Sequence, residues 1–181
     1  IIFSLYRNTP FMTVSDSTKA DLTKFGIPSN HVHVFLSGVL LHPPHPIPKK
    51  EKQTTIIFLG ALSKDKGVED AIAAFSHINQ LRPKWKYWIV GKGSPEYINY
   101  LVKLVKELKI DREVKFWGFV SAKQKFKLLA RVLLLINPSV REGWGLINIE
   151  ANSVGTPVIG YDVPGTRDAV IHNKTGILSP L

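Results

Sequence analysis

The stretch that decides the fold is residues 55–81, TIIFLGALSKDKGVEDAIAAFSHINQL. Its first five residues are apolar or β-branched and predict a short buried strand. A loop with a glycine at each end, Gly60 and Gly67, follows that strand. Residues 68–81 then carry apolar side chains at helical spacing along one side, which predicts an amphipathic helix. The stretch is therefore typical of a strand–loop–helix unit whose helix packs on a parallel sheet.

The same unit recurs along the rest of the chain. Further strands are expected at residues 86–90, 114–117, 132–136 and 157–161. Further helices are expected at residues 95–109, 122–131 and 146–154. Short apolar strands that alternate with helices predict an α/β fold class, a Rossmann-like parallel sheet with helices on both faces. We assign this domain to residues 54–181.

Residues 1–53 have a different character. We expect a strand at residues 11–14, a helix that Asp16 or Ser17 caps and that reaches Phe25, and a second strand at residues 32–36. These elements are too few for a domain of their own.

A proline-rich segment follows this part of the chain. Four prolines fall within residues 43–48, and proline joins neither the interior of a helix nor a central strand. A stiff, solvated linker is therefore expected there. The chain opens with Ile1 in an apolar run without a charged leader, so we expect it to be a piece of a longer protein.

The composition excludes several classes of protein. The chain has 181 residues, of which 44% are hydrophobic and 21% are charged, so it is neither disordered nor collagen-like. It has no apolar run near the roughly 20 residues that span a bilayer. Without cysteine it forms no disulfide, thiolate metal site or thiol nucleophile. Its formal net charge of +10 predicts attraction to a polyanion or an anionic surface.

The segment richest in chemistry spans residues 137–159, directly after one expected strand and before another. It therefore lies at the carboxyl end of a parallel strand, where α/β sheets bind ligands. Gly143 and Gly145 let the backbone approach a bound group, and the free amides of the helix that starts there suit a phosphate. Glu142 in the loop and Glu150 on the helix can converge on one polar ligand. The alternative is that both carboxylates serve only the helix and solvent.

Three more loops are predicted to meet at the same sheet edge. They are the loops at residues 60–67, 91–95 and 163–168. The first two offer glycines next to a helix start, and the third offers backbone amides and an acidic side chain. Each alone is compatible with an ordinary turn. Together they predict one binding edge, because the carboxyl ends of parallel strands lie side by side.

Other chemistries find less support. The histidines lack carboxylate or cysteine companions at ligand spacing, so no metal site is expected, and no Gly-x-Ser-x-Gly elbow is present. The basic stretch at residues 103–127 is interpreted mostly as a solvated face, with contact to an anionic membrane as the alternative. Its aromatic neighbours, Phe116, Trp117, Phe119 and Phe126, are expected in the core, which argues against nucleic-acid binding.

Taken together, these segments resemble the carboxyl-terminal domain of retaining glycosyltransferases of the GT-B fold, family 4, also called glycosyl transferases group 1. The matching segments are residues 13–18, 60–67, 88–93, 114–120, 155–158 and 165–176, Gly38 and the Glu142–Glu150 pair. The resemblance covers nearly the whole chain, and its first residues are similar to the end of the family's amino-terminal domain and the interdomain linker.

The resemblance implies a nucleotide-diphosphate sugar as donor substrate and no obligatory metal or other cofactor. Glu142 and Lys66 would be the catalytic pair, Glu142 on the donor sugar and Lys66 on the diphosphate. Glu150 would hold the ribose hydroxyls. The remaining donor-binding positions would be Gly60, Ala61, Gly91, Gly143, Gly145 and Leu146. Amides near Gly145 would offset the charge that develops on the leaving diphosphate.

Two positions depart from the family pattern. Ala61 stands where an arginine usually accompanies the lysine. The departure implies either weaker stabilisation of the leaving group or compensation by Lys64 or Arg141. Lys92 stands where the second glycine loop usually has an acidic residue.

The resemblance also implies partners and a location. The absent amino-terminal domain would bind the acceptor, a sugar or a lipid-linked glycan, so this chain alone would bind donor and transfer sugar poorly. The cytoplasm is the expected compartment, and surplus lysine suits peripheral docking at the cytoplasmic membrane face. Two other functions stay open: a non-catalytic nucleotide or sugar-phosphate binding module, and a basic adaptor for anionic surfaces.

Overall fold

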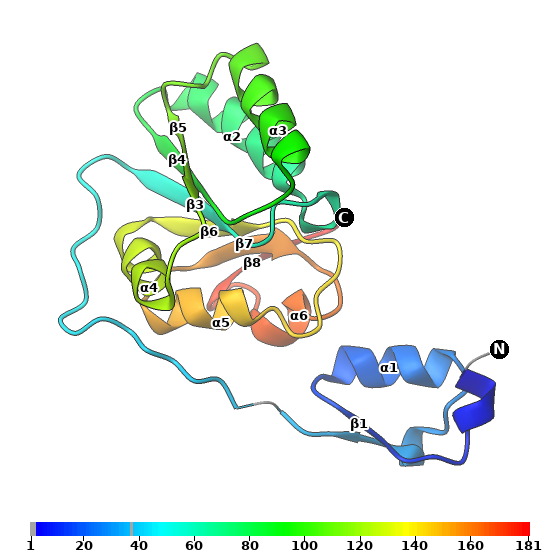
Figure 1. Ribbon diagram of the computed structural model, residues 1–181. Coiled ribbons are helices and arrows are strands. Elements are labelled where there is room, and N and C mark those ends of the chain that lie inside the picture. The colour runs from blue at the N-terminus through cyan, green and yellow to red at the C-terminus, as the bar shows by residue number, and fades with distance from the viewer. Residues whose placement is uncertain (1–2, 37) are drawn as a thin grey trace.

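The structure, a computed structural model, describes residues 3–36 and 38–181; Ile1, at which the chain opens, lies outside the described residues. Six parallel strands form the main sheet in the order β5-β4-β3-β6-β7-β8, and helices cover both of its faces (Figure 1). This arrangement confirms the α/β fold class expected from the sequence. In the described part of the chain, no helix has the length and apolar character needed to cross a bilayer.

The strands of the main sheet are β3 (Thr55–Leu59), β4 (Lys86–Val90), β5 (Val114–Gly118), β6 (Leu134–Asn137), β7 (Val158–Tyr161) and β8 (Gly176–Ser179). The helices are α2 (Val68–Leu81), α3 (Pro95–Glu107), α4 (Ala122–Arg131), α5 (Leu146–Ser153) and α6 (Thr166–Ala169), with the short 3-10 helix η3 (Lys64–Lys66) before α2. The sequence predicted most of these elements closely and missed β8 and α6. Both are four residues long, which is too short for a periodic pattern to stand out.

The middle of the sheet is β3, which pairs with β4 on one side and with β6 on the other. Successive side chains of a strand point to opposite faces. Ile56 and Phe58 therefore pack toward α2 and α3, whereas Ile57 packs toward α4 and α5. Burial on both faces explains why the strand is apolar along its whole length.

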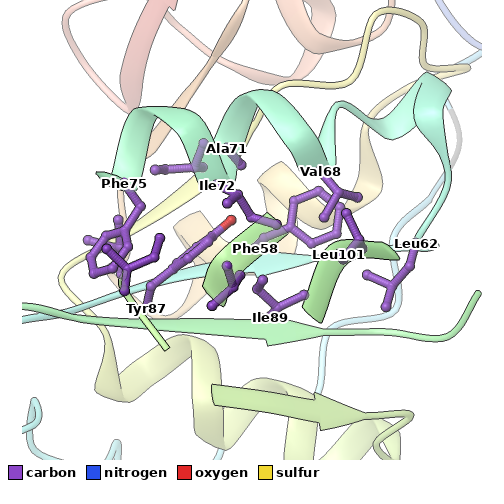
Figure 2. Packing of buried hydrophobic residues seen from close by; sticks show 13 residues of the cluster. Phe58, Leu62, Val68, Ala71, Ile72, Phe75, Tyr87, Ile89 and Leu101 are labelled. Atoms are coloured by element: carbon purple, nitrogen blue, oxygen red, sulfur yellow. The ribbon is translucent and has the colours of Figure 1, made fainter. Parts of the chain in front are cut away.

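The core under α2 and α3 is an interlocked layer of apolar side chains (Figure 2). Phe75 of α2 stacks on Tyr87 of β4, with ring centroids 5.0 Å apart. Phe58, Ile89 and Leu101 fill the space around this pair. The hydroxyl of Tyr87 has no hydrogen-bond partner among the described residues, and burial raises the pKa of this group.

The amino-terminal part is a small unit of its own. Its elements are η1 (Phe3–Tyr6), β1 (Phe11–Thr13), α1 (Asp16–Lys24), η2 (Ser29–His31) and β2 (Val32–Val34), and β1 pairs in parallel with β2. The expectation that Asp16 or Ser17 caps α1 was wrong. The cap is Ser15, whose extended backbone lets its hydroxyl accept a hydrogen bond from the Thr18 amide at 3.1 Å.

The proline-rich segment forms no helix or strand between residues 38 and 53. Pro43 and Pro46 are exposed, but the end of the segment is bonded to the sheet domain. The Lys50 ammonium donates to the Val132 carbonyl at 2.6 Å and to the Thr156 hydroxyl at 2.9 Å, and burial lowers the pKa of Lys50. The side chain of Glu51 pairs with Arg131. The linker is therefore anchored before β3 begins.

Replacing Phe75 by alanine tests the core under α2. The variant Phe75→Ala should lower the free energy of unfolding by about 3–5 kcal/mol, because it removes buried apolar area and leaves a cavity. The control is Leu81→Ala on the same helix, where the side chain is exposed. Urea unfolding followed by circular dichroism compares the two variants. Equal losses would contradict the assigned face of α2.

Tyr87→Phe tests the buried hydroxyl. The substitution should raise the free energy of unfolding by about 1 kcal/mol at neutral pH, because it removes a buried donor that has no partner. Above the ordinary tyrosine pKa of 10.0, the unfolded chain loses this proton while the folded chain keeps it. The stability of the unsubstituted chain should then fall by up to about 1.4 kcal/mol per pH unit more than that of Tyr87→Phe.

Urea unfolding at about pH 8 and about pH 11.5 measures this difference. A gap between the two proteins that stays constant over this range would contradict the burial of the Tyr87 hydroxyl.

Candidate functional site

The candidate site lies at the edge of the sheet formed by the carboxyl ends of the strands. At this edge the chain leaves β3 toward one side of the sheet and leaves β6 toward the other. The chain runs from β3 outward through β4 to β5, and then from β6 outward through β7 to β8. Ligands of α/β sheets bind at this kind of switch point. The sequence expectation that the loops at Gly60, Gly91, Glu142 and Gly165 share one edge is confirmed by this strand order.

Backbone hydrogen bonds join these loops in series. The Leu62 amide donates to the Lys92 carbonyl at 2.8 Å, which connects the loops after β3 and β4. The Val140 amide donates to the Asp65 carbonyl at 3.1 Å, and the Glu142 amide donates to the Pro164 carbonyl at 3.2 Å. The edge is therefore a bonded set of loops rather than separate turns.

Glycines allow these loops to lie close together. Gly91 has φ +149°, and a Cβ built there would be 1.7 Å from the Gly60 carbonyl oxygen. Gly67 has φ +65°, and its Cβ would be 2.1 Å from the Pro138 carbonyl oxygen. A side chain at either position would push two loops of the site apart.

Two adjoining cavities open between the loops. The larger cavity has a volume of about 480 Å³, and its lining includes residues after β6. The smaller cavity has a volume of about 440 Å³ and shares Leu59, Gly60 and Lys125 with the larger one. The expected site residues that line the larger cavity are Gly60, Lys66, Glu142, Gly143, Gly145, Leu146 and Glu150. Gly60, Ala61 and Gly91 line the smaller one. The structure thus brings every site residue chosen from the sequence to this pair of cavities.

The first ion pair of the site joins Lys66 and Glu142. The Lys66 Nζ atom lies 2.9 Å from Glu142 Oε1, and the two side chains are only 25% and 17% exposed. The Ser139 hydroxyl, which is fully buried, lies 3.5 Å from the same Nζ. Lys66 comes from η3 and Glu142 from the loop after β6, so the pair depends on the packing of these two loops.

The second ion pair joins Glu150 of α5 and Lys125 of α4. The two side chains are 14% and 23% exposed. Glu142 and Glu150 therefore line one cavity as the sequence predicted, and each holds a lysine of its own. Lysine is a flexible cation with several donors, so either pair can admit a further acceptor.

Lys125 was missed in the sequence because it belongs to the basic stretch interpreted as a solvated face. The other cations of that stretch are exposed, namely Lys103, Lys106, Lys109, Arg112, Lys115, Lys123 and Lys127. A signal was present, since Lys125, Leu128, Leu129 and Val132 follow the i, i+3, i+4, i+7 spacing of one helix face. That spacing places Lys125 beside the buried side of α4.

Phe119 was expected in the core, and this expectation was wrong. Its side chain is 71% exposed, and the Lys92 Nζ atom lies 4.7 Å from the centre of its ring. The reason is that β5 ends at Gly118, whose φ of +66° turns the chain away from the sheet. Both Phe119 and Lys92 line the smaller cavity, which is largely apolar.

Gly145 lines the larger cavity and also packs closely against another part of the chain. Its φ is +63°, and a Cβ there would lie 2.6 Å from Nδ2 of Asn148, a fully buried residue that accepts a hydrogen bond from Asn137 at 2.8 Å. The close approach of this glycine is thus to the chain itself. In the described residues no side chain caps the start of α5, so amides at Leu146 face the cavity without a competing acceptor from a cap.

The cations proposed to compensate for Ala61 do not line the cavity that Ala61 lines. Ala61 lines the smaller cavity and is exposed. Arg141 is also exposed and lines a third cavity of about 500 Å³ together with Lys66 and Glu142. Lys64 is exposed on η3.

A parallel sheet whose strand order reverses between β3 and β6, with helices on both faces, defines a doubly wound α/β protein. The chain matches the family Glycosyl transferases group 1 over residues 44–180. It therefore belongs to that family.

Relatives are found among bacteria and archaea. A glycogen synthase of Mycobacterium tuberculosis is 30% identical over 122 residues, which are 67% of this chain and 29% of that protein. An uncharacterized glycosyltransferase of Methanocaldococcus jannaschii, MJ1607, is 29% identical over 96% of this chain and 47% of its own length. The chain thus spans about half or less of these curated relatives.

Solved structures confirm the GT-B glycosyltransferase fold. The crystal structure of Anabaena Alr3699/HepE in complex with UDP and glucose superposes with a TM-score of 0.81 at 21% identity, over 99% of this chain and 52% of that one. The apo form of the lipopolysaccharide outer core galactosyltransferase WaaB superposes with a TM-score of 0.76 at 25% identity, over 94% of this chain and 48% of that one.

Gly91→Ala tests the close packing of the loops. The added Cβ meets the Gly60 carbonyl, so the variant should lose about 3 kcal/mol or more of unfolding free energy. The control is Gly155→Ala, where φ is +74° but the space around a Cβ is open. This control should cost only about 1 kcal/mol. Thermal unfolding of both variants provides the comparison, and a smaller loss in Gly91→Ala than in Gly155→Ala would contradict the loop arrangement.

Proposed function

We propose that this chain is the donor-binding half of a retaining glycosyltransferase, which moves a sugar from a nucleotide-diphosphate sugar to an acceptor hydroxyl. The observation that carries the proposal is that two partly buried ion pairs, Lys66–Glu142 and Lys125–Glu150, line one cavity at the switch point. Such a site offers both cations for a diphosphate and acceptors for sugar hydroxyls.

The diphosphate is proposed to lie between Lys66 and the start of α5. Breaking a sugar–phosphate bond leaves negative charge on the nucleotide diphosphate. The Lys66 ammonium and the amides at Gly145 and Leu146 are fixed positive groups that offset this charge as it develops. Interactions with this charge that are stronger in the transition state than in the intact donor lower the barrier for transfer.

The nucleoside is proposed to lie on the other side of Gly60. Glu150 accepts hydrogen bonds from the ribose hydroxyls, while Lys125 holds this carboxylate in place. The base then enters the smaller cavity, whose wall includes Val90, Phe119 and Val120. An exposed aromatic ring in an apolar hollow suits a planar base.

The sugar is proposed to face Glu142. The Glu142 carboxylate contacts hydroxyls of the donor sugar. Its ion pair with Lys66 compensates the negative charge of this carboxylate, which would otherwise repel the diphosphate. The acceptor is assigned to the part of the protein that the longer relatives have and this chain lacks. The chain alone should accordingly bind donor without efficient transfer.

Nucleotide binding by the 181-residue chain tests the proposal. Calorimetric titration with UDP, GDP and ADP should show selective binding of one nucleotide. UDP is the first probe because a solved structural neighbour holds it. Glu150→Gln and Lys66→Met should each weaken binding roughly 10- to 100-fold, the loss expected for a hydrogen bond to a charged group.

The matched controls remove the same kinds of charge outside the cavities. Lys103 and Glu107 form an exposed pair on α3 with a distance of 3.8 Å, and Lys103→Met and Glu107→Gln should leave affinity unchanged. Binding that falls equally in all variants, or that depends only on salt, would replace the donor-site proposal by a basic surface for anions. The absence of binding to any nucleotide would count against a preformed donor site.

A further inference from the structure

The amino-terminal start of α1 touches the sheet domain at the loops of the candidate site. The Ser17 amide donates to Asp168 Oδ1 at 3.4 Å, and the Ser15 hydroxyl donates to the Gly143 carbonyl at 3.5 Å. Ser15 is 1% exposed, so this end of α1 is packed against its neighbours. Figure 1 shows α1 on the side of the domain where α5 and α6 lie.

These contacts bond the start of α1 to the sheet domain. Among residues 3–36 and 38–181, they are the hydrogen bonds that join the amino-terminal unit to the sheet domain. No helix or strand lies between Val34 and Thr55 in the described chain. A carboxylate facing the first turn of a helix is also favoured by the helix dipole.

The second carboxylate oxygen of Asp168 accepts a hydrogen bond from a loop of the candidate site. The Gly165 amide donates to Asp168 Oδ2 at 2.9 Å, which holds the turn before α6. Gly165 lies directly against Glu142, since a Cβ at Gly165 would be 2.3 Å from the Glu142 carbonyl oxygen. The Glu142 amide also donates to the Pro164 carbonyl at 3.2 Å. Asp168 thus supports the backbone that carries Glu142.

A cavity lies between α1 and the candidate site. The cavity of about 500 Å³ has Thr18 and Leu22 of α1 on one side and Lys66 and Glu142 on the other. A shift of α1 would change the width of this cavity, and a shift of the Gly165 turn would move Glu142. Asp168 touches both parts with its two carboxylate oxygens.

We propose that Asp168 is a positioning residue that latches α1 over the site and at the same time holds the backbone of Glu142. The latch stands on the contacts alone, and its consequence for sugar transfer rests on the proposed function. Loss of the carboxylate should free α1 from the domain and loosen the loop of Glu142.

A distance measurement on the 181-residue chain tests the latch directly. The chain has no cysteine, so spin labels attach only to Ala20→Cys on α1 and Lys123→Cys on α4, two exposed positions. Double electron–electron resonance without nucleotide should give one narrow distance peak. Asp168→Ala should broaden this peak, Asp168→Asn should broaden it partly, and Asp168→Glu should restore it.

The matched control is Asp162→Ala, which removes an exposed carboxylate that pairs with Arg167 at 2.9 Å and is not bonded to α1. It should leave the distance peak narrow. Hydrogen exchange adds a residue-level readout. In Asp168→Ala the Ser17 amide should exchange roughly tenfold faster, while the Thr18 amide, bonded to Ser15, should not change.

Each outcome bears on the latch. A narrow, unmoved peak in Asp168→Ala, or equal broadening in Asp162→Ala, overturns the proposal. If Asp168→Ala does not fold, as judged by circular dichroism, Asp168→Asn decides by the same two readouts. Nucleotide titration of the unsubstituted chain is a separate measurement. If the distance measurement supports the latch and no nucleotide binds, the donor site is refuted and the latch is not. If nucleotide binds and the distance measurement contradicts the latch, only the latch is refuted.

Discussion

The structure depends on the position of β3, a strand bonded on both sides and buried on both faces. Because β4 pairs with one edge of β3 and β6 with the other, the sheet grows first in one direction and then in the opposite one. The chain therefore leaves β3 and β6 toward opposite sides of the sheet, and the crevice at this switch point is a consequence of strand order. The cavities at Gly60 and Glu142 follow from that geometry.

The chemistry of the crevice is organised by lysine–carboxylate pairs. A carboxylate removed from water is costly unless a cation compensates it. Glu142 and Glu150 meet this requirement with lysines from η3 and α4, elements that are distant from them in the chain. Pairing also limits the directions that each side chain can take. The site is therefore shaped before any ligand enters, which is the condition for electrostatic stabilisation of a developing charge.

The amino-terminal unit and the sheet domain are connected at two separated places. The linker ends in contacts of Lys50 with the Val132 carbonyl and the Thr156 hydroxyl, far along the chain from α1. The start of α1 meets the site at Gly143 and Asp168. The amino-terminal unit is therefore held both at the end of the linker and at the loops of the candidate site.

Local patterns in the sequence are enough to predict the strand–loop–helix units, since burial on a sheet imposes a period on every strand and helix. They also placed Glu142 and Lys66 in loops and Glu150 on a helix at one edge, because parallel strands share the direction of their carboxyl ends. Tertiary packing alone established that Lys125 pairs with Glu150, that Phe119 leaves the core and that Asp168 meets α1. The reason is physical: these contacts join residues from separate elements, whose meeting depends on packing that no single stretch of sequence encodes.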